Sequence, residues 1–291
     1  METPKNTVIS GLMGKKKRAA CAQMTAGDDL TSNLKECRRL SALAAAQEAD
    51  LLLLPECFPF LGRHERDKFA AAEALDPKNP GPILCTLQEI AQQHQMWVVA
   101  GGLPEALTGE NRETHTYNTA VVLDSAGEIV ASYRKLHLFD VDIPGGATLK
   151  ESDATMGGSE AKVVSTPIGK VGLSICYDLR FPELYRKLVC EMGAEILVIP
   201  AAFTAHTGAA HWHTLLRARA IENQAYVLAA GQWGKHNEKR ESYGHSMIVD
   251  PWGRIVAEHG DGCGVVVSEI DLASLAKTRQ QMPCLSHRKI I

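Results

Sequence analysis

The sequence predicts an α/β protein that contains a mixed β-sheet or two sheets packed face to face. Three observations support this prediction. Apolar strands alternate with amphipathic helices in the first third of the chain, the alternation returns after the middle, and three pairs of strands are joined by short turns. Alternating strands and helices favour parallel pairing, whereas short turns join antiparallel strands. The chain therefore needs both kinds of pairing.

The first third of the chain has the order β-α-β-α-β. A strand over Arg18–Met24 precedes a helix that the pair Asp28-Asp29 can cap. The continuous apolar run Leu51–Leu54 is typical of a strand buried on both faces. A helix over Pro82–His94 and a strand over Trp97–Gly101 follow. This order predicts parallel strands.

Three hairpins and a second α/β region make up the rest. The hairpin strands are predicted over Thr119–Leu123 with Glu128–Leu136, Val163–Ser165 with Val171–Ile175, and Ser246–Val249 with Arg254–Ala257. The second α/β region contains a helix from Pro182 to about Gly193, a strand over Glu195–Pro200, a helix over His211–Asn223 and a strand over Ala225–Ala230. A strand over Val265–Ile270 and a helix capped by Asp271 end the chain, and Pro144–Lys162 is predicted to be the longest loop.

Size and composition indicate a globular protein with one domain. The 291 residues are 45% hydrophobic and 22% charged, and they contain neither a linker nor a repeat. We expect residues 1–16 to be a disordered N-terminal extension and residues 17–291 to form the domain. The net charge of −3 predicts no nucleic-acid partner, and no apolar run approaches the length of a membrane span. Eight cysteines without a CxxC pair, in a chain that begins without a secretory signal, predict reduced thiols in the cytoplasm.

Cys176 is the candidate nucleophile. It follows the alternating strand Val171–Ile175 and precedes Pro182, which is well placed to begin a helix. Free N–H groups at a strand-to-helix turn favour both a thiolate and an oxyanion. The alternative is that Cys176 is one more small buried hydrophobic residue.

Three charged residues are candidates for the chemistry around this cysteine. Glu56 follows the most apolar strand, where poor solvation would make its carboxylate a stronger base, although a cap or a salt bridge is the alternative. Lys135 ends an alternating strand and would supply a cation for an oxyanion, although charged strand ends are often only solvated. Glu151 lies in the long loop and would by default be a surface carboxylate.

The histidines at positions 206, 211, 213 and 245 are candidates for a Cys–His pair or a zinc site. They lack the spacing of HExxH or a comparable motif. We therefore expect no metal and no cofactor.

Five segments resemble the nitrilase superfamily of C–N hydrolases, and more narrowly its Nit branch. They are LLLLPECF, YRKLHLFDVDIPGG with LKES, VGLSICYDLRFPE, AHWHTLLRARAIENQAYVLAAG and RESYGHSMIVDPWG. The resemblance runs from about Arg18 to the C-terminus. It implies a four-layer α-β-β-α sandwich, a homodimer across a helical face, and a catalytic set of Glu56, Lys135 and Cys176 with Glu151 as a supporting glutamate. The family commonly has Glu where this chain has His213, and Glu or Pro at the position of Ala209. We expect both departures to lie beside the pocket and to affect substrate detail.

The resemblance also implies amide hydrolysis through a thioester. Glu56 would accept the proton of Cys176, and Lys135 with the backbone N–H of Tyr177 would hold the oxyanion. Glu151 would orient Lys135 or the attacking water. Arg180 could clamp a substrate carboxylate, with a structural ion pair as the alternative.

The substrate that the resemblance implies is deaminated glutathione, an α-keto acid γ-linked to cysteinylglycine, mainly because of LHLFDVD and TGAAHW. Thr204 and Thr207 are candidates to line its pocket. The second candidate substrate is α-ketoglutaramate, the substrate of an ω-amidase. A scaffold without catalysis and a thiol redox sensor are further alternatives. The intact Glu56, Lys135 and Cys176 argue against the scaffold.

Overall fold

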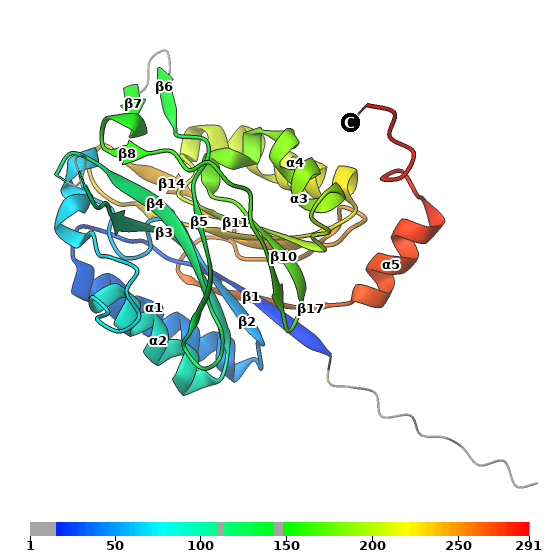
Figure 1. Ribbon diagram of the computed structural model, residues 1–291, viewed down its shortest axis with the longest axis horizontal. Coiled ribbons are helices and arrows are strands. Elements are labelled where there is room, and N and C mark those ends of the chain that lie inside the picture. The colour runs from blue at the N-terminus through cyan, green and yellow to red at the C-terminus, as the bar shows by residue number, and fades with distance from the viewer. Residues whose placement is uncertain (1–15, 110–112, 143–147, 291) are drawn as a thin grey trace, which may run out of the picture.

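The computed structural model describes residues 16–109, 113–142 and 148–290, and it contains two β-sheets packed face to face between two pairs of helices (Figure 1). Helices α1 (Leu30–Ala46) and α2 (Pro82–His94) cover the outer face of the first sheet. Helices α3 (Pro182–Cys190) and α4 (Ala205–Asn223) cover the second sheet. The predicted four-layer α-β-β-α sandwich is confirmed.

The first sheet has seven strands in the order β17-β1-β2-β3-β4-β5, and β8 pairs with β4. β1, β2 and β3 pair in parallel, as their alternation with helices predicts. Hairpin β4–β5 and strand β17 add antiparallel pairs. The strands are β1 (Lys17–Gln23), β2 (Leu51–Leu54), β3 (Trp97–Ala106), β4 (Thr116–Leu123), β5 (Ile129–Arg134), β8 (Thr155–Met156) and β17 (Gly264–Ile270).

The second sheet has six strands in the order β16-β15-β12-β11-β10-β9. Its central strands β10, β11 and β12 are parallel, and the two other predicted hairpins form its edges. The strands are β9 (Val163–Thr166), β10 (Gly169–Leu173), β11 (Ile196–Ala201), β12 (Tyr226–Gly231), β15 (Met247–Val249) and β16 (Ile255–Glu258).

The remaining elements are short or lie at the periphery. Two small antiparallel pairs join β6 (Asp140–Asp142) with β7 (Thr148–Lys150), and β13 (Trp233–Lys235) with β14 (Glu241–Tyr243). The helical turns η1 (Glu65–Ala71), η2 (Glu151–Asp153) and η3 (Cys176–Arg180) are 3-10 helices, and α5 (Leu272–Gln281) follows β17. Among the helices of the described chain, none has both the length and the apolar content that crossing a bilayer requires.

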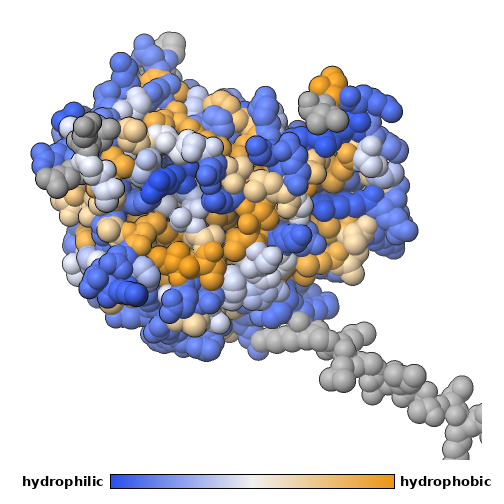
Figure 2. Space-filling view, in the orientation of Figure 1, coloured by the Kyte–Doolittle hydropathy of each residue, from blue (hydrophilic) through white to orange (hydrophobic). Residues whose placement is uncertain are grey.

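Buried side chains form one core that lies between the sheets and continues between the second sheet and its helices, and another between the first sheet and its helices. All four residues of β2 are fully buried, as the apolar run Leu51–Leu54 predicts. Apolar side chains also gather across the middle of the face shown in Figure 2, where the two sheets reach the surface, with polar side chains around them.

Capping confirms several predicted element ends. Asp29 caps α1 by accepting from the N–H groups of Thr31 and Ser32, and Asp271 caps α5 by accepting from Ser274. Pro82 and Pro182 each begin a helix at the expected position.

Most element boundaries lie within three residues of the prediction, and three differences are larger. Strand β3 continues past Gly101 to Ala106, because a bulge with Gly102 at φ +72° lets the ladder resume. Helix α4 begins at Ala205 rather than His211, and its Gly208 packs so closely on Tyr243 that a Cβ there would overlap the ring. This close packing requires glycine at position 208, although glycine has a low intrinsic propensity for helix interiors.

The predicted loop Pro144–Lys162 is the third difference. Part of it, residues 144–147, lies outside the described residues. The described part contains β7, η2 and β8, so it is more regular than a loop. Of residues 1–16, which we expect to be disordered, residues 1–15 lie outside the described part. Lys16 is described, and its Nζ lies 2.8 Å from a carboxylate oxygen of Glu269.

The contact between β3 and β11 gives a test of the sheet packing. A Cβ added at Gly101 would overlap the ring of Pro200, so Gly101→Ala must move the two sheets apart locally. We expect the variant to lose about 1–3 kcal/mol of unfolding free energy in urea. Gly27→Ala is the matched control, since a Cβ there meets no atom within 4 Å. Its free energy of unfolding should stay within about 0.5 kcal/mol of the parent. Equal stability of the two variants would contradict the packing.

Candidate active site

Glu56 lies just beyond the C-terminal end of β2 and is only 4% exposed. Its Oε1 accepts from Lys135 Nζ and Asn118 Nδ2, each at 2.9 Å, and its Oε2 accepts from the Ala202 N–H at 2.9 Å. Gln232 Nε2 donates to the Glu56 carbonyl, also at 2.9 Å. Burial of Glu56 is as predicted, but its carboxylate is surrounded by hydrogen-bond donors rather than by hydrocarbon.

Lys135 connects Glu56 to Glu151. It directly follows β5, is 2% exposed, and donates from Nζ to Glu56 Oε1 at 2.9 Å and to Glu151 Oε2 at 2.8 Å. Asn118 Nδ2 also donates to both carboxylates, at 2.9 Å each. The Phe139 N–H donates to Glu151 Oε2 at 2.8 Å. Lys135 and Glu151 are therefore buried members of one hydrogen-bonded cluster, not a solvated strand end and a surface carboxylate.

The charges in this cluster are mutually dependent. Burial lowers the pKa of Lys135, but the carboxylates of Glu151 and Glu56 outweigh burial and raise that pKa well above its usual range. Burial raises the pKa of Glu151, but Lys135, Lys68 and hydrogen bonds lower it to about 2. The site therefore holds an ammonium and a Glu151 carboxylate at neutral pH.

Cys176 is the first residue of η3, between β10 and α3, and is 9% exposed. Its φ of +47° lies in the left-handed region, which is uncommon for a residue other than glycine. The Glu56 carboxylate and the Ala202 N–H lie close enough to its sulfur to influence the pKa of the thiol. Burial and the Glu56 charge raise the pKa of the thiol well above its usual range, despite the opposing charge of Lys135. Cys176 is therefore a protonated thiol beside a carboxylate base.

Asp178 holds the strained turn in place. Its fully buried carboxylate accepts from the Ile175 N–H at 2.8 Å, from the Tyr133 hydroxyl at 2.7 Å and from the His137 N–H at 3.1 Å. These bonds join the turn that carries Cys176 to β5 and to the segment after Lys135. They offset the cost of the left-handed conformation at Cys176.

Sequence reasoning missed Asn118, Asp178 and Gln232 as members of the site. Asp178 was in the segment CYDLR, but only the fold shows that it binds β5. Asn118 precedes the predicted strand, and the observed β4 includes it. Gln232 follows β12 and had no signal in the sequence beyond its polarity.

A cavity of about 480 Å³ opens beside these residues. Its lining includes all eight predicted site residues: Glu56, Lys135, Glu151, Cys176, Tyr177, Arg180, Thr204 and Thr207. The lining also includes His206, one of the candidate histidines, and several basic side chains that the sequence did not single out: His64, Lys68, His236, Lys239 and Arg240. Two of these, Lys68 and Arg240, form ion pairs with Glu65.

The predicted substrate contacts face this cavity. Arg180 Nη1 lies 3.2 Å from His211 Nδ1, and its guanidinium lies 5.0 Å from the centre of the Phe203 ring. Within the described residues, Arg180 has no ion pair with a carboxylate, so the alternative of a structural ion pair is not supported. The hydroxyls of Thr204 and Thr207 lie 2.7 Å apart. These groups are available to a polar ligand.

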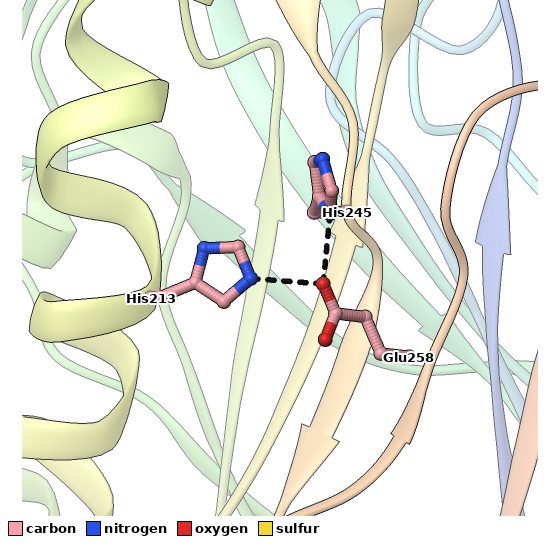
Figure 3. Close-up of side chains that lie close together, drawn as sticks. All are labelled: His213, His245 and Glu258. Carbon is pink, nitrogen blue, oxygen red and sulfur yellow. Dashed lines mark hydrogen bonds and ion pairs between the residues drawn. The ribbon is translucent and has the colours of Figure 1, made fainter.

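The two family departures do not line the cavity, since neither Ala209 nor His213 is among its lining residues. Helix α4 directs His213 toward Glu258 and His245 (Figure 3). The helix begins at Ala205, so its cavity-lining residues are in its first turn and His213 lies two turns further along.

The depressed pKa of Glu151 predicts a loss of stability in acid. Its folded pKa of about 2 lies below its ordinary value of 4.5, so its contribution is complete above about pH 4.5 and disappears as the pH falls toward 2. Urea unfolding from pH 6 to pH 3 should show a smaller loss in Glu151→Gln than in the parent. The exposed neighbour Asp153 provides the control Asp153→Asn, which should retain the pH dependence of the parent. Identical curves for Glu151→Gln and the parent would contradict the ion pair with Lys135.

Comparisons with known proteins give the family. The carbon-nitrogen hydrolase model matches residues 18–280. The chain is 44% identical over 283 residues to deaminated glutathione amidase of Dictyostelium discoideum, covering 96% of each chain. The NitFhit structure of C. elegans superposes with a TM-score of 0.86 at 42% identity, over 94% of this chain and 65% of that one. A Nesterenkonia amidase structure with acrylamide added to its active-site cysteine superposes with a TM-score of 0.72 at 28% identity, over 92% of this chain and 98% of that one. The chain therefore belongs to the carbon-nitrogen hydrolase family.

Proposed function

We propose that the chain is an amidase that cleaves its substrate through a thioester on Cys176. The observation that carries this proposal is that the Cys176 thiol lies at the wall of the same cavity as the buried, hydrogen-bonded pair of Glu56 and Lys135. A thiol nucleophile needs an adjacent base, and a tetrahedral intermediate needs a positive or N–H donor at its oxygen. This cluster offers both groups.

Glu56 acts first as a base. Because its pKa is raised, the Cys176 thiol keeps its proton until the substrate is attacked. The proton then moves to Glu56 as the sulfur attacks the amide carbonyl and the C–S bond forms. The oxyanion is held by Lys135 and by the N–H of Tyr177. Tyr177 is the second residue of η3, so its N–H has no carbonyl partner inside that turn.

Glu56 then acts as an acid and again as a base. It gives its proton to the leaving amine as the C–N bond breaks, which leaves an acyl group on sulfur. It next removes a proton from water, which adds to the thioester, and the thiol is regenerated when the C–S bond breaks. Glu151 supports this cycle by holding Lys135 through its bond at 2.8 Å.

Deaminated glutathione is the substrate that we propose, with 2-oxoglutarate and cysteinylglycine as products. The relatives from Dictyostelium and mouse carry the name deaminated glutathione amidase, the mouse protein at 46% identity over 93% of this chain and 82% of its own length. The cavity of about 480 Å³ suits a small molecule of this size class. The substrate has two carboxylates, and Arg180 is a guanidinium that can bind one of them bidentately. Thr204 and Thr207 add hydroxyl donors beside it.

We also propose that residues 17–291 act as one domain, that the protein is a cytoplasmic homodimer, and that its partner molecule is a small amide. Ile221 on α4 and Trp252 are 44% and 56% exposed, which suits an interface on the helical face. All eight cysteines are free thiols, as in a reducing compartment.

Sedimentation should give twice the mass of one chain, and a monomer would contradict the dimer.

Substitution of the two central residues tests the chemistry. Cys176→Ala removes the nucleophile, so we expect amide hydrolysis to fall by at least about a thousandfold. Glu56→Gln keeps the shape but removes the base, and kcat should fall by about 10²–10⁴. Cys190→Ala, at the end of α3, is the control and should keep full activity. Appreciable turnover by Cys176→Ala would exclude the thioester. Loss of activity in Cys190→Ala would instead favour the alternative of a redox sensor, in which Cys176 and Cys190 form a pair.

A comparison of substrates tests the specificity. With product identification, kcat/KM should be higher for deaminated glutathione than for α-ketoglutaramate, and cysteinylglycine rather than ammonia should be the released amine. Arg180→Gln should raise KM for deaminated glutathione by about tenfold to a hundredfold, because a charged hydrogen bond is lost. A preference for α-ketoglutaramate would make the chain an ω-amidase. Absence of hydrolysis across a panel of amides would favour a scaffold.

A further inference from the structure

Outside the cavity, three side chains from separate elements converge on one point (Figure 3). His213 lies on α4, His245 lies between β14 and β15, and Glu258 is the last residue of β16. Glu258 Oε1 lies 2.8 Å from His213 Nε2 and 2.7 Å from His245 Nδ1. One possible ligand atom from each residue lies within 4.8 Å of the other two. Two imidazole nitrogens and one carboxylate oxygen therefore face a common position.

The surrounding structure orients both histidines. The fully buried Trp212 donates from Nε1 to the His245 carbonyl at 2.9 Å, which joins α4 to the segment before β15. His245 has a left-handed backbone with φ of +55°. The Tyr243 ring stacks on His245 at 4.5 Å and meets His213 edge-on at 6.0 Å. The histidines are thus positioned by packing and by a strained backbone as well as by Glu258.

The arrangement of hydrogen-bonding atoms in the cluster suits a cation. A single carboxylate oxygen now lies between two ring nitrogens, each of which must hold a proton to donate to it. A metal ion would replace those two protons.

Two histidines and a carboxylate are ligands that zinc prefers. Zinc bonds to nitrogen and oxygen are about 2.0–2.2 Å long, so ligand atoms around a tetrahedral ion lie roughly 3.3 Å apart. The present separations of 2.7 and 2.8 Å from Glu258 are about half an ångström shorter than that spacing, so the carboxylate would withdraw by about that distance to admit an ion. The three side chains are 26–33% exposed, which leaves an ion a path from solvent and water a fourth coordination position.

We propose that His213, His245 and Glu258 bind one Zn²⁺ ion. The ion would tie α4 to β16 and to the segment between β14 and β15. Both α4 and β14 carry cavity residues, Thr207 and Ser242, so the ion would stabilise one wall of the cavity from outside. The expectation that the histidines form no metal site came from their spacing along the chain, and the fold brings the ligands together from three elements. This proposal is independent of the proposed amidase function.

Metal titration of the full chain, after removal of metal with a chelator, tests the site. Calorimetry should show one equivalent of Zn²⁺ bound, and Mg²⁺ should not compete because it prefers oxygen ligands. Co²⁺ should give visible absorption of a tetrahedral site without the near-ultraviolet band of a thiolate ligand. His213→Gln and Glu258→Gln should each weaken Zn²⁺ binding by at least about a hundredfold. His94→Gln, at the end of α2 on the opposite side of the molecule, should bind as the parent does (Figure 1).

Zn²⁺ should also raise the melting temperature of the parent and of His94→Gln, but not that of His213→Gln. The parent alone decides the outcome if a variant fails to fold. A parent that binds no Zn²⁺, a thiolate band with Co²⁺, or unchanged affinity in both ligand variants would overturn the proposal.

Discussion

The ammonium of Lys135, held between the carboxylates of Glu56 and Glu151, is the interaction on which the site depends. All three groups are buried, and a buried charge is costly unless it is paired and hydrogen-bonded. Asn118 donates to both carboxylates, as Lys135 does, so the two negative charges share these two donors. Removal of Lys135 would leave two carboxylates facing each other in the interior, where one of them would have to take up a proton. The three charged groups therefore depend on one another, and in the proposed mechanism they determine where the oxyanion would form.

The packing of the two sheets brings the sulfur to this cluster. Glu56 comes from the first sheet and Cys176 from the second, and Ala202, just after β11, donates its N–H to the Glu56 carboxylate across the two sheets. Gln232, just after β12, binds the Glu56 carbonyl across the same interface. These contacts lie at the C-terminal ends of strands, where sites in α/β sheets form. A displacement of one sheet against the other would separate the base from the thiol while leaving each sheet intact.

Local patterns in the sequence predicted most of the elements but fewer of the contacts. The apolar run Leu51–Leu54 and the caps Asp29 and Asp271 act locally, and the structure has them where they were predicted. Glu56, Lys135 and Cys176 were identified as candidates because they sit at strand ends. Asn118 and Gln232 were not, since their roles arise only when distant strands meet. The same reason explains His213, whose partner Glu258 is far along the chain.

The proposed mechanism places the acyl group on Cys176, beside Glu56 and Lys135. Mass spectrometry of the parent, quenched in acid during turnover of deaminated glutathione, tests this claim most directly. We expect a 2-oxoglutaryl group on the peptide that contains Cys176, and no such group in Glu56→Gln. An acyl group on a different cysteine, or steady turnover with Cys176 never modified, would contradict the account.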